Sequence, residues 1–157
     1  MSNQGQVCYT FEAAVEMAIT MESEGFRHYL EAMRKVTNKG AREILRDSAL
    51  DELEHKHQLE KALLDGHMGS NQLTKPVPTM NLGYTLVKKE LGPQSDAREA
   101  LAFAIHLEKG AIDFYQKMSQ GCAGAPMAGL FERLLADESR HLQSLEDLYE
   151  EHFLSEN

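Results

Sequence analysis

The sequence has few cysteines, and they form no metal-binding pattern. The only two, Cys8 and Cys122, lie far apart and match no spacing such as Cys-x-x-Cys, so a site built from thiolates is not expected. An isolated pair of this kind is typical of free thiols in a reducing compartment. We therefore expect a cytoplasmic protein.

Long apolar runs and positive charge are also scarce. No apolar run approaches the roughly 20 residues that cross a bilayer, and the polar residues 1–6 lack the basic and then apolar pattern of an export signal. The 16 Lys and Arg are outnumbered by 25 Asp and Glu, giving a net charge of −9 that argues against nucleic acid or a membrane as a partner. The length of 157 residues suits one domain.

What the sequence does contain is a repeated motif. The pattern Asp-Glu-x-x-His occurs at residues 51–55 and again at 137–141, an offset of 86 residues. At the same offset, Glu22 corresponds to Glu108. These matches predict two copies of one helical hairpin, each with a single glutamate on its first helix and a Glu-x-x-His motif on its second.

Apolar residues that recur every three or four positions predict four amphipathic helices. Their ends are marked by Thr10 and Asp96 as N-caps, Glu99 as the partner in a capping box, Gly66 as a stop and Pro126 as a first helical residue. The predicted helices span about 10–36, 41–65, 96–119 and 126–152, with a further short helix near 82–91. We predict an all-α antiparallel four-helix bundle in a single domain, residues 1–157, with hairpin 1 at about 10–65, a long connection at 66–95 and hairpin 2 at about 96–153.

The two glutamates of each hairpin should lie at one height in the bundle. In an antiparallel hairpin, residues equidistant from the turn lie level along the axis. The midpoint of Glu22 and Glu52 is position 37, at the first turn, and that of Glu108 and Glu138 is position 123, in the second. Stacked hairpins therefore bring these groups together in the core. The candidate metal ligands are Glu22, Glu52, His55, Glu108, Glu138 and His141.

This set of residues suits a pair of metal ions. Four carboxylates buried without compensation would cost many kcal/mol, whereas two divalent cations supply about four positive charges and neutral imidazoles add none. We predict two divalent ions, either iron, manganese or a mixed pair; interhelical salt bridges are the purely structural explanation. A third Glu-x-x-His, at Glu54 and His57, has no repeat partner and is interpreted as surface.

The remaining aromatic and histidine residues leave more than one interpretation. Tyr29 and Tyr115, repeat partners about two turns past the single glutamates, are either core aromatics or hydrogen-bond donors to ligand carboxylates. The other histidines lack symmetric partners and are expected to face solvent. They are His28, His67, His106 and His152.

Residues 10–153 resemble the ferritin-like di-iron superfamily, and in particular its rubrerythrin-like branch. The motifs that carry the resemblance are Glu22 followed by Tyr29, Glu108 with Phe114-Tyr115, and the two Asp-Glu-x-x-His sequences. The resemblance implies a ferritin-like bundle in which the six candidates bind two irons and Glu52 and Glu138 bridge them.

The resemblance also implies partners for the two ligand histidines. Asp51 would pair with His141, and Asp137 would pair with His55, so that each aspartate orients an imidazole of the opposite hairpin. The alternative is that both aspartates are plain solvated charges.

Two departures from the family pattern affect the expected activity. Typical rubrerythrins carry a rubredoxin-type iron site with two Cys-x-x-Cys pairs, which this sequence lacks, so electrons must come from a separate protein or reductant. An extra glutamate one turn past the third-helix ligand is replaced by Ala111, whose repeat partner is Gly25. The site is then closer to the six-ligand type of bacterioferritin, which weakens the inference of a peroxidase mechanism.

Our first hypothesis is a di-iron oxidoreductase that reduces hydrogen peroxide or dioxygen with electrons from an external donor, such as a rubredoxin or a reductase. Its proposed catalytic residues are Glu22, Glu108, Tyr29 and Tyr115. The alternatives are a ferroxidase of the iron-storage type and a non-enzymatic metal-binding bundle. We expect a homodimer, because bundles of this type often pair through a long helix face.

Overall fold

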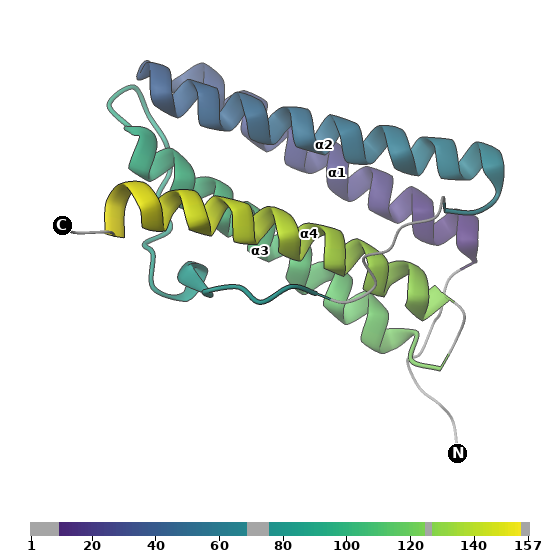
Figure 1. Cartoon of the computed structure of the whole chain (residues 1–157). Coiled ribbons are helices and arrows are strands. Elements are labelled where there is room, and N and C mark those ends of the chain that lie inside the picture. Colours follow the sequence, from purple (N-terminus) through teal and green to yellow (C-terminus); the bar gives the residue numbers. More distant parts are fainter. Residues whose placement is uncertain (1–9, 69–75, 125–126, 155–157) are drawn as a thin grey trace.

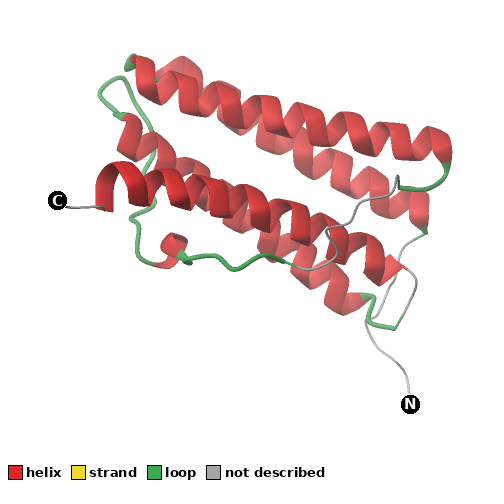
Figure 2. Ribbon diagram, viewed as in Figure 1, coloured by secondary structure: helices red, strands yellow, loops and turns green. Residues whose placement is uncertain are grey.

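The computed structural model describes residues 10–68, 76–124 and 127–154. Within these ranges the chain forms four long helices and two short helical turns, and no strand (Figure 1; Figure 2). The helices are α1 Phe11–Lys35, α2 Lys39–Asp65, α3 Ala97–Gly121 and α4 Met127–Tyr149, and the turns are η1 Leu82–Tyr84 and η2 Glu150–Leu154. The predicted all-α fold is confirmed.

Capping residues set the helix boundaries of the first hairpin. Thr10 Oγ1 accepts a hydrogen bond from Ala13 N at 3.2 Å, as predicted for an N-cap. Asn38 Oδ1 accepts one from Ala41 N at 2.9 Å, so α2 begins at Lys39, earlier than predicted. Gly66 has a left-handed conformation, with a φ of 78°, and ends α2 as predicted.

The second hairpin begins at a similar cap. Asp96 Oδ1 accepts a hydrogen bond from Glu99 N at 2.9 Å, and α3 then continues to Gly121, slightly beyond its predicted end. The last helix changes after Tyr149 into the π-helical turn η2. The predicted helix start at Pro126 lies outside the described residues.

The helices pack as two antiparallel hairpins, one on the other (Figure 1). The first hairpin is α1 with α2, the second is α3 with α4, and α2 also contacts α3. Because the described part of the connection returns along the second hairpin, α2 and α3 run in the same direction (Figure 1). This arrangement agrees with the long crossover predicted between the hairpins.

The connection is held against α4 by a buried carboxylate. Glu146, with no exposed surface, accepts hydrogen bonds from Met80 N at 2.9 Å and from Leu82 N at 2.7 Å. Ser139 Oγ, also on α4, accepts one from Val77 N at 2.9 Å. The segment therefore follows α4 in an extended conformation, and the short helix predicted near 82–91 is reduced to the single turn η1.

The connection also changes one prediction about side-chain exposure. His106 was expected to face solvent, but it is half-buried, with its Nε2 2.9 Å from Leu86 O of the connection. His28, His67 and His152 are exposed, as predicted.

The core consists of apolar clusters on both sides of the level predicted for the metal ligands. One cluster contains Leu59, Tyr115 and Phe131, and another contains Tyr29 and Leu45. Along α1, Glu22 falls between the residues that belong to these two clusters. The apolar packing therefore encloses the polar level from both ends of the bundle.

The structure also bears on the predicted state of the cysteines and on membrane-spanning helices. Cys122 is disulfide-bonded, so the expectation of a free thiol is wrong for this residue, and Cys8 lies outside the described residues. The free thiol from which a reducing compartment was inferred is therefore not present at Cys122. Among the described helices, none is both long and apolar enough to cross a membrane.

Candidate metal centre

Four glutamates, one from each long helix, meet in the interior of the bundle. Glu22, Glu52, Glu108 and Glu138 are 1%, 7%, 3% and 2% exposed. Ligand atoms of Glu22, Glu52 and His55 lie within 4.8 Å of one another, and so do those of Glu52, Glu108 and Glu138. Glu52 belongs to both groups. The fold thus brings five of the six predicted ligands into two adjoining groups that share one glutamate.

The two histidines lie on one side of this cluster. His55 Nδ1 is 3.2 Å from Glu138 Oε1 and 3.4 Å from Glu22 Oε2, so the ring is in direct contact with both hairpins. His55 Nε2 is 3.0 Å from His141 Nε2. The sixth predicted ligand, His141, therefore contacts the cluster through the other imidazole.

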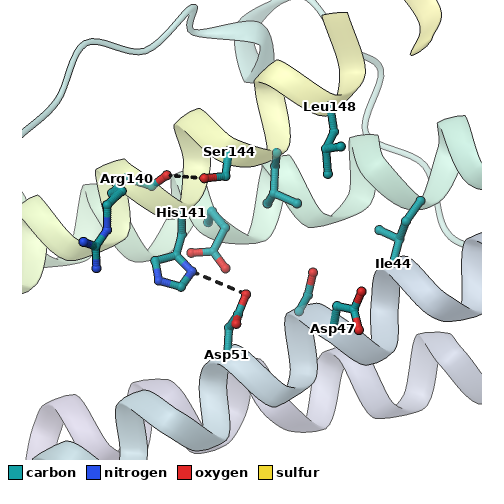
Figure 3. A pocket seen from close by; sticks show the side chains of 10 residues that line it. Ile44, Asp47, Asp51, Arg140, His141, Ser144 and Leu148 are labelled. Carbon is teal, nitrogen blue, oxygen red and sulfur yellow. Dashed lines mark hydrogen bonds and ion pairs between the residues drawn. The ribbon is translucent and has the colours of Figure 1, made fainter. Parts of the chain in front are cut away.

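The predicted aspartate partner of His141 lies next to its ring. Asp51 Oδ2 lies 3.6 Å from His141 Nδ1, across the interface between α2 and α4 (Figure 3). Asp137 acts on His55 through its charge. Burial lowers the pKa of His55, but Glu22, Glu108 and Asp137 outweigh it and raise that pKa above its ordinary value.

Both tyrosines donate hydrogen bonds to the single glutamate of the other hairpin. Tyr29 Oη lies 3.2 Å from Glu108 Oε1, with Ala104 O as a second acceptor at 3.3 Å, and Tyr115 Oη lies 3.2 Å from Glu22 Oε1. Of the two interpretations open for these residues, the structure has the hydrogen-bonded one. Burial and the neighbouring carboxylates raise the pKa of both phenols, so they remain protonated donors.

Crowding of the carboxyl groups separates their pKa values. Burial, a hydrogen bond with Glu22 and the charge of Glu108 raise the pKa of Glu52 to about 12. Burial and the same neighbours raise the pKa of Glu138 well above its ordinary value. Burial acts in the same direction on Glu22, but hydrogen bonds from His55, Glu52 and Glu138 lower its pKa to about 2. Glu52 and Glu138 therefore favour the protonated form, and Glu22 favours the ionised form.

The cluster leaves acceptor atoms that the protein itself does not satisfy. Glu108 Oε2 and Glu138 Oε2 are buried and have no hydrogen-bond partner. A buried acceptor without a partner is costly, and a cation at this position would satisfy both oxygens and balance the carboxylate charge. Oxygen donors together with imidazole suit iron or manganese. The residues present thus suit a pair of divalent ions.

Gly25 is a part of this site that the sequence pattern did not identify as functional. It lies one turn after Glu22 on α1, and a Cβ atom placed there would be 3.0 Å from Glu52 Oε2. The missing side chain lets the Glu52 carboxylate lie close to the backbone of α1. The signal in the sequence was the mismatch between Gly25 and its repeat partner Ala111.

Comparison with known proteins gives one match. The sequence profile of the rubrerythrin family matches residues 13–149. This chain belongs to the rubrerythrin family. That family is part of the ferritin-like di-iron superfamily, and the matched residues include all six predicted ligands. No curated protein and no solved structure matches the chain.

Proposed function

We propose that this rubrerythrin-family protein is a di-iron oxidoreductase that reduces hydrogen peroxide or dioxygen with electrons from an external donor. The observation that carries the proposal is the pair of ligand groups that share Glu52. The buried oxygens of Glu108 and Glu138 without hydrogen-bond partners add to it. A shared carboxylate with open acceptors on the same level is the arrangement that a bridged pair of iron ions requires.

The six predicted ligands would hold the two ions, with Glu52 and Glu138 between them. When bound, the iron pair supplies the two electrons that peroxide takes up, together with two protons, to leave as two waters. Tyr29 and Tyr115 fix the orientation of Glu108 and Glu22 through their hydrogen bonds. The apolar clusters close the site to bulk water at the two ends of the bundle.

The electrons would come from outside the bundle. The two cysteines of the sequence cannot form the pair of Cys-x-x-Cys motifs that a rubredoxin-type iron site requires. A separate rubredoxin or a reductase is therefore the proposed donor. The homodimer is part of the same proposal, because bundles of this type often pair through a long helix face.

A ferroxidase function is the second candidate, and Ala111 favours it. The half-buried alanine occupies the position of the extra glutamate of the family, which leaves a simple six-ligand set. In this case the centre would oxidise ferrous iron for storage rather than consume peroxide. A centre that only binds metal and holds the two hairpins together is the non-enzymatic alternative.

The test is to count the iron that each chain retains. The purified protein is loaded without oxygen with excess ferrous iron, oxidised with peroxide, desalted and analysed for iron. About two ions per chain, followed by peroxide consumption with a reductant and a rubredoxin, would support the proposal. Tens of ions per chain would indicate storage. Essentially no iron in a folded protein would show that the cluster is structural.

A further inference from the structure

Among the pockets lined by described residues, two of the larger ones open beside the metal centre, one next to each ligand histidine. A much smaller one, of about 10 Å³, lies against His55, Glu22 and Glu138. The pocket beside His141 has a volume of about 260 Å³ and lies between α2 and α4, with Glu108 of α3 also in its lining (Figure 3). The pocket beside His55 has a volume of about 330 Å³ and is also lined by α2 and α4. The internal repeat relates the two pockets, because the offset of 86 residues connects His55 with His141 and Asp51 with Asp137.

The two pockets differ in charge at corresponding positions. Asp47 lines the pocket beside His141, and its repeat partner in the other pocket is Arg133. The charged side chains of the first pocket, apart from the histidine, are Asp47, Asp51, Glu108 and Arg140, whereas those of the second are Lys61, Asp65, Arg133, Asp137 and Arg140. Acidic groups therefore outnumber basic ones beside His141, and the balance is reversed beside His55. Figure 3 shows Arg140 on the opposite side of the His141 ring from Asp47.

In the pocket beside His141, which we call the acidic pocket, carboxylate side chains lie at successive depths from the solvent to the interior. Asp47 is exposed, and Asp51, one turn further along the same face of α2, has a side chain that is 56% exposed. The His141 side chain, 20% exposed, follows, and Glu108 lies deepest, at 3%. The Oε2 atom of Glu108 is buried without a hydrogen-bond partner. The series thus ends at an acceptor that lacks a ligand.

We propose that divalent metal ions enter the centre through the α2–α4 pocket beside His141, attracted by Asp47 and Asp51, and not through the basic pocket beside His55. The inference rests on the metal centre of the proposed function and adds the route by which that centre is filled. A carboxylate at the mouth of a cleft raises the local concentration of cations and increases their rate of binding. The effect acts at a distance and is screened by salt.

The test measures the rate of Co²⁺ uptake, followed by the visible absorption of the bound ion in a stopped-flow experiment at low ionic strength. The variant is Asp47→Asn, which removes one charge from the acidic pocket without altering a predicted ligand. The matched control is Asp65→Asn, which removes the same charge from the other pocket. Cobalt content at equilibrium is measured for all three proteins to separate the route from the centre.

We expect Asp47→Asn to slow uptake about fivefold and Asp65→Asn to change it by less than about twofold. The difference should largely disappear near ~1 M salt, and the equilibrium cobalt content should stay the same. Uptake by Asp47→Asn at the unmodified rate, or equal slowing in both variants, would overturn the proposed route. Loss of equilibrium cobalt in folded Asp47→Asn would also overturn it, because Asp47 would then belong to the centre. No uptake by the unmodified protein would instead refute the metal centre itself.

Discussion

The two hairpins carry the same ligand pattern but have different surroundings. On α4, Glu146 is fully buried and holds the connection through two backbone N–H groups. Its repeat partner on α2 is Glu60, whose side chain is 54% exposed and which only approaches Lys56 at 3.9 Å. In the described part of the connection, residues 77–86 lie along the second hairpin (Figure 1), and contact with the first hairpin comes only later, where Thr37 Oγ1 donates to Pro93 O at 2.7 Å. Equivalent positions in a repeat therefore acquire different roles from whatever packs over them.

The difference between the hairpins reaches the metal centre as well. Glu52 of the first hairpin belongs to both ligand groups and lies against Gly25, whereas the position equivalent to Gly25 in the second hairpin is Ala111. The two pockets beside the centre also differ at equivalent positions, because Asp47 lines the pocket beside His141 and Arg133 lines the pocket beside His55. A symmetric set of ligands is thus held in an asymmetric protein.

The largest expected effect is that of Glu52→Gln. We expect this change to reduce metal affinity by at least about a hundredfold, because Glu52 is the carboxylate shared by both groups. Stability of the protein in chelator should be unchanged or higher, since a buried acid with a pKa of about 12 is replaced by a neutral amide. Isothermal titration with Mn²⁺ and thermal unfolding in chelator check the two parts. Glu54→Gln, in the exposed motif, is the control and should retain full affinity.

The next largest expected effect is the loss of stability when Glu146 of the second hairpin is replaced. Glu146→Ala should lower the free energy of unfolding by about 2–4 kcal/mol, because two backbone donors of the connection lose their acceptor. The equivalent change Glu60→Ala should stay within about 0.5 kcal/mol, because that side chain is exposed. Urea unfolding of both variants measures the difference. Equal effects would mean that the connection contributes little to the stability of the second hairpin.

Much of the fold and of the candidate centre could be predicted from the sequence, because the repeat and the helical spacing can be read directly from the residue types. The pattern of residue types along each helix was enough to predict the N-caps Thr10 and Asp96. It was also enough to predict that the four candidate ligand glutamates are buried. Glu146 could not be identified in this way. Its role depends on the backbone of a distant segment, and its sequence neighbours resemble those of exposed Glu60.

The same limit applies to the sites that sequence reasoning left open or misjudged. The two interpretations of Tyr29 and Tyr115 could be separated only when the other hairpin was in place, since each phenol contacts a glutamate across the bundle. His106 was expected at the surface because it has no repeat partner, and nothing in α3 indicates that the connection covers it. The repeat pattern does not determine which side chains the connection covers, or whether a core tyrosine of one hairpin reaches a glutamate of the other.

A smaller effect should distinguish Gly25 from Ala111. In Gly25→Ala the new Cβ would lie 3.0 Å from Glu52 Oε2, so the carboxylate must shift, and we expect metal affinity to fall about tenfold. Ala111→Gly should instead leave affinity unchanged and lower stability by about 1 kcal/mol, the usual cost of glycine within a helix. Metal titration and urea unfolding of both variants provide the comparison. Equal affinities in the two variants would contradict the asymmetry proposed for the centre.

The smallest expected difference is between Tyr29→Phe and Tyr115→Phe, where the two hairpins should behave alike. Each change removes one phenol that donates to the single glutamate of the other hairpin, at the same distance of 3.2 Å. Each should cost about 1 kcal/mol, because one hydrogen bond is lost within a packed site, and both variants should still bind two ions. Tyr29 has a second acceptor, Ala104 O, so its loss should be slightly the larger. Urea unfolding in chelator and metal content measure these effects, and a loss of metal in only one variant would show that the asymmetry extends to the tyrosines.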